Sequence, residues 1–149
     1  MSRVQLALNV SNIDEAVAFY SKLFATEPAK RKPGYANFAI AEPPLKLVLI
    51  EGVGGGTLNH LGVEVETGAE VEAAEARLSG EGVETTGVDD TICCYAAKTE
   101  TWVKDPDGAP WEYYVKTGDT DQMTNTILGE GATAQCCAAE ADSETSAIT

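Results

Sequence analysis

A chain of 149 residues is long enough for one core or for two small modules that share a core, but too short for two independent enzyme-sized domains. The formal net charge of −14 argues against nucleic acid and anionic lipid as partners, because both are recognised through clustered Lys and Arg. No apolar run approaches the roughly 18 residues that span a bilayer, and the opening residues do not resemble a secretory signal. We therefore expect a cytoplasmic protein with no membrane partner.

The first half of the chain predicts one strand, one helix and then further strands. Alternation of apolar and polar residues indicates a strand at 4–10. Ser11 and Asn12, followed by two acids, are typical of a helix start, and apolar residues recur at helical spacing until about Ala25. The remaining features predicted here are strands at 35–41 and 45–51 and a flexible glycine linker at 52–56.

The second half repeats this order of elements. A strand at 60–66 precedes a helix at 69–79. The three strands predicted after this helix are 83–88, 99–104 and 111–115. The last two are joined by Asp-Pro-Asp-Gly, a strong turn sequence because Pro presets φ and Gly accepts positive φ.

The repetition predicts an α+β fold of two tandem βαβββ modules, about residues 2–52 and 58–116, within one domain at 1–116. Two such curved modules side by side would form a trough whose floor receives side chains from equivalent strands. Beyond Lys116 the chain has six acids and not one Lys or Arg. Such a segment buries too little apolar surface to offset its ordering entropy, so we expect residues 117–149 to be a disordered acidic tail.

The four cysteines occur as two adjacent pairs, Cys93-Cys94 and Cys136-Cys137. In a chain of cytosolic character we expect reduced thiols rather than a disulfide framework. Neighbouring side chains of a regular strand point to opposite faces, so Cys93 and Cys94 act together only on a bent loop. There, two thiolates would make a soft site for trivalent arsenic, cadmium or zinc, although two unrelated cysteines remain an alternative. Cys136-Cys137 is either an auxiliary trap or, as we favour, dispensable.

Three residues spaced about one module apart could hold a metal ion: Gln5, His60 and Glu112. His60 is the only histidine, and Glu112 interrupts an otherwise hydrophobic strand. Taken singly, each is explained as well by a structural role or a solvent-facing position. Together, the imidazole, the carboxylate and the amide oxygen are similar to the facial triad of Fe(II) oxygenases with Gln in place of one His. An amide ligand predicts weaker metal binding than a second histidine would give.

The segments VQLALNVSNIDEAVAFYSKLF, NHLGVEV and DPDGAPWEYY resemble the vicinal-oxygen-chelate superfamily over about residues 2–116. This superfamily includes glyoxalase I, extradiol dioxygenases and fosfomycin-resistance transferases. The resemblance implies that Gln5, His60 and Glu112 are the metal ligands and form the catalytic centre. Glyoxalase I usually takes a fourth ligand from the last strand of its first module, where Glu51 is the only acid nearby, and this weakens the glyoxalase interpretation.

Adjacent cysteines in the second module, combined with the Gln/His/Glu set, resemble one branch of the superfamily in particular. This branch contains the ArsI carbon–arsenic lyases, which depend on Fe(II), and their cadmium-induced CadI relatives. The resemblance implies that Cys93 and Cys94 bind a trivalent organoarsenical, such as methylarsenite or an aromatic arsenical. Fe(II) on the three ligands would activate dioxygen, and arsenite would be released as a detoxification product.

The sequence is compatible with two other functions and with two assembly states. A non-enzymatic protein that sequesters arsenic or cadmium would use the same ligand atoms. A fosfomycin-type transferase would need cations for its phosphonate, and Lys98 and Lys104 are the only Lys or Arg between Leu78 and Trp111. Both modules are on one chain, so a monomer and a homodimer that exchanges modules are both compatible with a complete site.

Overall fold

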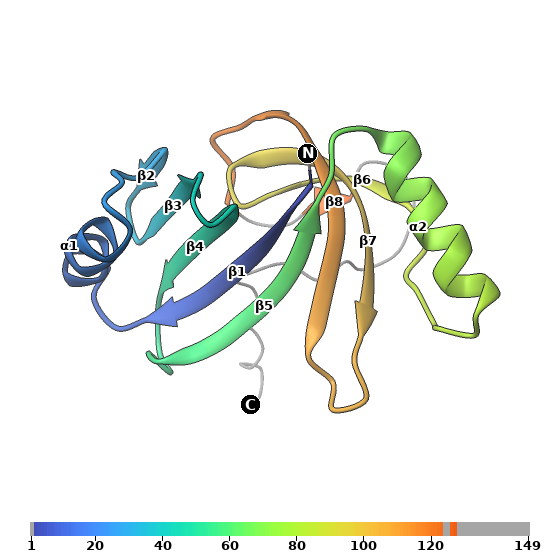
Figure 1. The fold of residues 1–149 in the computed structure, drawn as a ribbon, viewed down its shortest axis with the longest axis horizontal. Helices are drawn as coiled ribbons and strands as arrows, with labels where there is room; N and C mark the ends of the chain where they lie inside the picture. The colour runs from blue at the N-terminus through green and yellow to red at the C-terminus, as the bar shows by residue number, and fades with distance from the viewer. Residues whose placement is uncertain (1, 124–125, 128–149) are drawn as a thin grey trace, which may run out of the picture. The chain divides into compact units, whose positions relative to one another are not determined.

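The computed structural model describes residues 2–123 and 126–127, and it divides the chain into two compact units. The first unit is Arg3–Gly62, and the second unit contains Ser2 and the described residues from Val63 onward. Strands and helices follow the order βαβββ, βαβββ along the chain, and a short strand β9 (Thr126–Ile127) ends the described part (Figure 1). The expected α+β fold of two tandem βαβββ modules is confirmed.

The first unit is a mixed sheet with one helix. Its strand order is β2-β3-β4-β1-β5, with β1 parallel to β4 and β3 antiparallel to both of its neighbours. β1 and β5, far apart in sequence, therefore lie side by side (Figure 1). The elements are β1 (Arg3–Val10), α1 (Ile13–Phe24), β2 (Lys30–Lys32), β3 (Tyr35–Ile40), β4 (Leu45–Glu51) and β5 (Thr57–Glu64), whose last two residues belong to the second unit.

Helix α1 begins and ends where its sequence provides caps. The Asn12 side chain accepts a hydrogen bond of 2.9 Å from the Glu15 backbone N–H, satisfying one of the N–H groups at the helix start. Glu51, at the end of β4, supplies a second cap, because its Oε2 accepts a hydrogen bond of 2.9 Å from the Ile13 backbone N–H. Ala25 ends the helix in the left-handed conformation, with φ of 52°.

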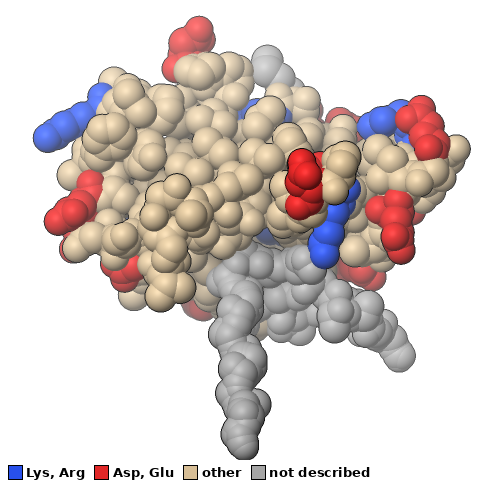
Figure 2. All heavy atoms as spheres, turned by 90° about the horizontal axis from the view of Figure 1, so that it is seen from below, with Lys and Arg blue, Asp and Glu red and all other residues tan. Residues whose placement is uncertain are grey.

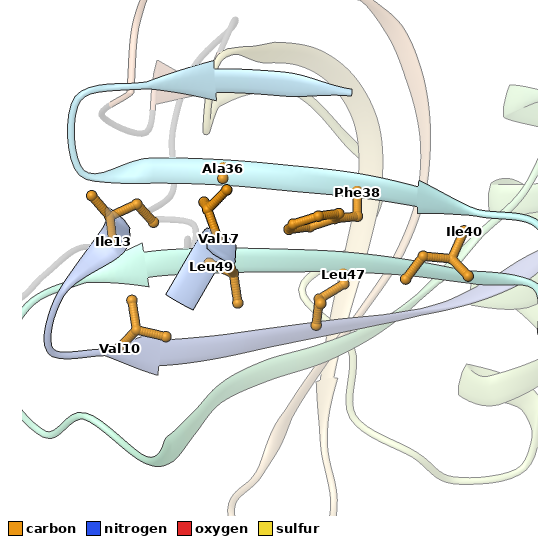
Figure 3. Close-up of a cluster of buried hydrophobic side chains, with 8 residues drawn as sticks. All are labelled: Val10, Ile13, Val17, Ala36, Phe38, Ile40, Leu47 and Leu49. Carbon is orange, nitrogen blue, oxygen red and sulfur yellow. The ribbon is translucent and has the colours of Figure 1, made fainter. Parts of the chain in front are cut away.

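The core of the first unit lies between α1 and one face of its sheet (Figure 3). Leu6, Leu8 and Val10 of β1 pack toward this core. Because side chains alternate along a strand, Gln5 and Asn9 lie on the opposite face of the sheet. The buried members of the core are Val10, Ile13, Val17, Ala36, Phe38, Ile40, Leu47 and Leu49.

The second unit is an antiparallel sheet with one helix. Its strand order is β8-β7-β6-β9, and α2 packs against β7 and β8 through a core that includes Val65, Val71 and Val115. At the start of α2 the Thr67 hydroxyl accepts a hydrogen bond from the Glu70 backbone N–H and donates one to the Glu70 carboxylate. The elements are α2 (Gly68–Gly80), β6 (Asp89–Cys93), β7 (Ala96–Lys104) and β8 (Pro110–Asp119).

The structure differs from the predicted elements around β6. The strand predicted at 83–88 is wrong, and β6 begins only after it. Thr86 does bond to β7, but partly through its side chain, which accepts from the Trp102 backbone N–H at 3.1 Å. Gly87 then adopts a positive φ of 83°, which interrupts regular strand pairing.

The C-terminal boundary also differs. β8 continues to Asp119, beyond the boundary predicted at Lys116. Residues 128–149, including Cys136 and Cys137, lie outside the described residues.

Charged side chains are sparse on the face drawn in Figure 2. On the face in Figure 2, basic side chains are scattered rather than gathered into one patch, and most of the surface is neither acidic nor basic. In the described part of the chain, both helices are too short and too polar to traverse a bilayer.

Candidate functional site

Gln5 and His60 form a buried side-chain pair in the first unit. Each side chain is 3% exposed, and Gln5 Nε2 lies 3.2 Å from His60 Nε2. An amide NH2 group only donates, so in this arrangement the His60 Nε2 atom accepts and carries a lone pair. This lone pair is the electron pair that a metal ion would take, and it faces a residue whose amide also offers an oxygen.

The rest of this sheet face offers no carboxylate from β4. The strand register pairs Gln5 with Lys46, and the buried side chains of β4 are all apolar: Leu47, Val48, Leu49 and Ile50. Glu51 is exposed and is engaged at the start of α1. The first unit therefore brings Gln5 and His60 together without a fourth, acidic ligand of the kind that glyoxalase I usually has.

Glu112 lies on the face of the second unit's sheet that points away from α2. β8 pairs Glu112 with Trp102 of β7, and the following pair on this face is Tyr114 with Glu100. Glu112 is 1% exposed and accepts a hydrogen bond of 2.7 Å from Lys98 Nζ. The same ammonium lies 4.8 Å from the centroid of the Tyr114 ring, a cation–π contact. The carboxylate is thus buried and compensated by a cation.

Glu100 adds a second buried carboxyl to this cluster. Burial, together with the negative charge of Glu112, raises the pKa of Glu100 to about 8, although Lys98 opposes the shift. At neutral pH the Glu100 carboxyl is therefore mostly protonated. A neutral Glu100 leaves Lys98 as the cation that balances Glu112.

Cys93 and Cys94 lie at the hairpin turn between β6 and β7. Cys93 pairs with Ala96, and the two residues between them, Cys94 and Tyr95, have φ of 57° and 65°, as in a two-residue turn of type I′. Both cysteines are buried, and their Sγ atoms lie 3.1 Å apart. The prediction that the pair acts together only on a bent segment fits this turn.

The distance between the two sulfur atoms bears on the oxidation state of the pair. The 3.1 Å between the two Sγ atoms is a non-bonded contact, longer than the roughly 2.05 Å of a disulfide bond, so the expectation of reduced thiols stays a prediction. The turn itself brings the two sulfur atoms together, which makes both reachable by one oxidant or one soft ion.

The register of β6, β7 and β8 relates the cysteine turn to Glu112. β6 pairs Cys93 with Ala96 and Thr91 with Lys98, so Cys93 shares its sheet face with Lys98. Lys98 in turn contacts Glu112. The second unit therefore carries the Cys93 sulfur and the buried Glu112 carboxylate on one sheet face, with Lys98 between them.

Backbone hydrogen bonds hold the cysteine turn from the segment that follows β8. The backbone N–H groups of Cys94 and Tyr95 donate to the carbonyls of Met123 and Gln122, both at 2.9 Å. Thr120 N–H donates to the Tyr95 carbonyl at 3.0 Å. Residues that the sequence assigned to a tail thus position the turn.

Lys98 and Glu100 had no predicted role. The signal that would have revealed them is period-two alternation: every second residue of β7 from Ala96 to Trp102 faces the Glu112 side, and two of these are charged. The described residues contain no cluster of three or more His, Cys, Asp and Glu that could hold a metal ion. The predicted set has only two residues of those types, with an amide as the third.

A family model described as the Glyoxalase/Bleomycin resistance protein/Dioxygenase superfamily matches residues 3–113, and the chain belongs to this superfamily. The chain is 55% identical over 139 residues to the trivalent organoarsenical cleaving enzyme of Thermomonospora curvata, covering 92% of this chain and 89% of that protein. It is 51% identical over 142 residues to the cadmium-induced protein CadI of Mycobacterium bovis, covering 92% and 93%. The resemblance inferred from the sequence is confirmed.

The fold also matches solved structures. The Mn(II)-bound glyoxalase from Novosphingobium aromaticivorans superposes with a TM-score of 0.56 at 18% identity, covering 82% of this chain and 43% of that one. This likeness concerns the fold.

Proposed function

We propose that this chain is a carbon–arsenic lyase that takes trivalent organoarsenicals, such as methylarsenite and aromatic arsenicals, and releases arsenite with the use of Fe(II) and dioxygen. The observation that carries the proposal is the cysteine turn: two Sγ atoms 3.1 Å apart, with Cys93 on the sheet face that holds Glu112. The name of the Thermomonospora curvata relative, a trivalent organoarsenical cleaving enzyme, supports the choice of substrate.

Gln5, His60 and Glu112 would hold the metal ion. The donor set fits, because one imidazole nitrogen, one carboxylate and one amide oxygen leave open positions on Fe(II). The burial fits as well, since all three side chains are at most 3% exposed and polar groups so buried need partners. Fe(II) bound there would supply the activation of dioxygen.

Cys93 and Cys94, once reduced, would bind the arsenic. Each thiol replaces one hydroxyl of R–As(OH)2, and its proton leaves with that hydroxyl as water, so that two As–S bonds fix the arsenic while the As–C bond stays intact. A soft dithiolate selects trivalent arsenic over the hard ions of the cell. Holding the substrate at two points also replaces an encounter in solution by a fixed orientation.

Lys98 and Glu100 would set the charge around the Glu112 carboxylate. The Lys98 ammonium would balance the negative charge of Glu112 in its buried setting, and the neutral Glu100 adds no second negative charge beside it. The buried Tyr114 ring beneath the ammonium helps to exclude water from this face.

The overall reaction balances without an external reductant. For methylarsenite, CH3As(OH)2 and one O2 have the same atoms as formaldehyde and As(OH)3. The As–C bond breaks, the carbon is oxidised, and dioxygen accepts the electrons. Formaldehyde is therefore a second product to measure beside arsenite.

Variants separate the two halves of the proposed site. The Cys93→Ser/Cys94→Ser variant should lose methylarsenite retention on a desalting column but keep Mn(II) binding. The Glu112→Gln variant should keep methylarsenite retention and lose Mn(II) binding, and both variants should lose arsenite release. Near-normal release by the cysteine variant would refute arsenic capture by this turn, provided that circular dichroism shows all three proteins folded.

A second function is favoured by the similarity to CadI, which is named a cadmium-induced protein. In this alternative the same cysteines sequester Cd(II) or arsenite without turnover. Tight retention of Cd(II) by the reduced chain, together with no arsenite release from methylarsenite in the presence of iron and air, would favour it.

A further inference from the structure

A chain of side-chain hydrogen bonds leads from the loop after β4 to His60, entirely within the first unit. Thr57 Oγ1 donates to the Gly54 carbonyl at 2.5 Å, and Asn9 Nδ2 donates to Thr57 Oγ1 at 2.9 Å. Asn59 Nδ2 donates to Asn9 Oδ1 at 2.9 Å, and Asn59 Oδ1 lies 2.8 Å from His60 Nδ1. This series of hydrogen bonds connects an exposed loop to the buried imidazole of His60.

The donor and the acceptor of every hydrogen bond in this series follow from its first acceptor, the Gly54 carbonyl. A backbone carbonyl only accepts hydrogen bonds, so the Thr57 hydroxyl donates its hydrogen to the Gly54 carbonyl. The same hydroxyl oxygen must therefore accept from the Asn9 side chain. The Asn9 NH2 group therefore faces Thr57, and its oxygen faces Asn59. The Asn59 NH2 group then faces Asn9, and the Asn59 oxygen faces His60.

An oxygen at this position requires a donor, so His60 Nδ1 carries the proton. The neutral imidazole then has its lone pair at Nε2, where it accepts from Gln5 at 3.2 Å. The two contacts of the ring, at Nδ1 and at Nε2, agree on one tautomer.

We propose that Thr57, Asn9 and Asn59 are positioning residues that fix His60 in the Nδ1–H tautomer and so present its Nε2 lone pair to the metal ion. The metal-binding part rests on the proposed function, in which His60 is a ligand, whereas the tautomer is a property of the metal-free chain. A hydrogen bond to the far nitrogen of a ligating histidine orients the ring and raises its basicity.

The glycine segment predicted as a flexible linker is the fixed end of this chain of bonds. Gly52 N–H donates to the Val10 carbonyl at 3.0 Å, and Gly56 N–H donates to the Asn9 carbonyl at 2.9 Å. A Cβ atom at Gly55 would lie 2.8 Å from the Ser11 backbone nitrogen, closer than side chains allow. The lack of a side chain at Gly55 thus lets the loop lie against the end of β1 and hold the Gly54 carbonyl in place.

Nitrogen-15 NMR tests the tautomer directly, because His60 is the only histidine and its ring signals need no assignment. The full chain, without an affinity tag and treated with a chelator, is measured at a pH where the imidazole is neutral. We expect a protonated-type shift at Nδ1 and an unprotonated-type shift at Nε2. Thr57→Val should mix the two tautomers, whereas Thr57→Ser, which keeps the hydroxyl, should not.

Mn(II) titration gives a second readout. Asn59→Ala should weaken Mn(II) binding by about 10- to 100-fold, as loss of such a partner does elsewhere, while Asn59→Asp keeps the acceptor and should bind nearly as well as wild type. Asn12→Ala, which removes only a helix cap, is the matched control and should change neither the tautomer nor the affinity.

A wild-type spectrum with the proton on Nε2 overturns the inference, and so does an Asn59→Ala protein that keeps both the tautomer and the Mn(II) affinity. Failure of the proposed function has a different signature. The NMR result would then be as expected while the iron-loaded chain releases no arsenite.

Discussion

Lys98 Nζ lies 2.7 Å from Glu112 Oε1, and both side chains are buried, at 6% and 1% exposure. A buried carboxylate needs a positive charge beside it. In the metal-free chain the Lys98 ammonium supplies this charge to Glu112. The ion pair therefore holds the Glu112 side chain in place in the metal-free chain. A bound divalent ion would share the same carboxylate with Lys98.

Replacing Lys98 by methionine should destabilise the metal-free chain. Removing one partner of a buried ion pair typically costs about 3–5 kcal/mol, because the remaining charge has no compensation. Mn(II) should restore much of this loss by compensating Glu112, so the stabilisation by Mn(II) should be larger in Lys98→Met than in wild type. Urea unfolding with and without Mn(II) measures both quantities.

Lys116→Met is the matched control for this experiment. Lys116 also forms an ion pair, with Asp119 at 2.8 Å, but these side chains are 35% and 65% exposed. Pairs of this kind contribute about 0–1 kcal/mol, so little change is expected. Equal effects of the two substitutions would contradict a special role for the buried pair.

Gln5→His should strengthen metal binding. An imidazole is a better ligand for divalent transition metals than an amide oxygen, and the substitution would give two histidines and one carboxylate. We expect the dissociation constant for Mn(II) to fall at least about tenfold, which corresponds to roughly 1.4 kcal/mol. Isothermal titration of wild type, Gln5→His and Gln5→Leu measures this, and an unchanged affinity in all three would argue against Gln5 as a ligand.

Glu100→Gln should stabilise the metal-free chain at alkaline pH. The pKa of Glu100 is raised from 4.5 to about 8, so between these values the folded state holds a proton that the unfolded state has released. The free energy of unfolding of wild type therefore falls as pH rises through this range, by up to about 1.4 kcal/mol per pH unit. Glu100→Gln lacks this loss, so the difference in free energy of unfolding between the variant and wild type should grow from pH 4.5 to pH 8.

Urea unfolding across this pH range, in the presence of a chelator, measures the difference. Glu72→Gln on the exposed surface of α2 serves as the control and should follow wild type. A Glu100→Gln advantage that does not depend on pH would show that Glu100 is ionised in the folded state.

Truncation after Asp119 should weaken arsenic binding by the reduced chain. It removes the carbonyls of Gln122 and Met123 that hold the Cys94 and Tyr95 backbone, so the two thiolates lose their fixed spacing. Truncation after Ile127 keeps these contacts and should bind methylarsenite nearly as well as the full chain. Retention of arsenic after gel filtration compares the three lengths; equal retention would contradict a positioning role for this segment.

The sequence predicted the fold well where periodicity and caps agree. Helix α1 begins after Asn12 as expected, because the cap, the acids and the apolar spacing all point to one boundary. It also singled out Gln5 and His60, as metal ligands; their side chains bond to each other in the structure, and the role as ligands stays a prediction. These features are local or follow from the repeated order of elements.

Features that depend on long-range strand pairing could not be predicted from the sequence. Lys98 gains its role only from β7 pairing with β8, which brings its ammonium to Glu112 from fourteen residues away. The hydrogen-bond chain from Gly54 to His60 requires β1 beside β5, and nothing in the pattern around Asn9 or Asn59 reveals that contact. The glycine loop looked flexible because composition alone does not show what its backbone bonds to.

The most direct test of the proposed lyase is a reaction of the full wild-type chain, reduced and loaded with Fe(II) under argon, with methylarsenite. Half of the sample is then opened to air, and arsenite and formaldehyde are measured in both halves. We expect equal amounts of the two products in the aerated half, and none under argon or after chelation of the iron. Methylarsenite that stays bound and intact in the aerated half, with iron present, would contradict the lyase and leave sequestration as the function.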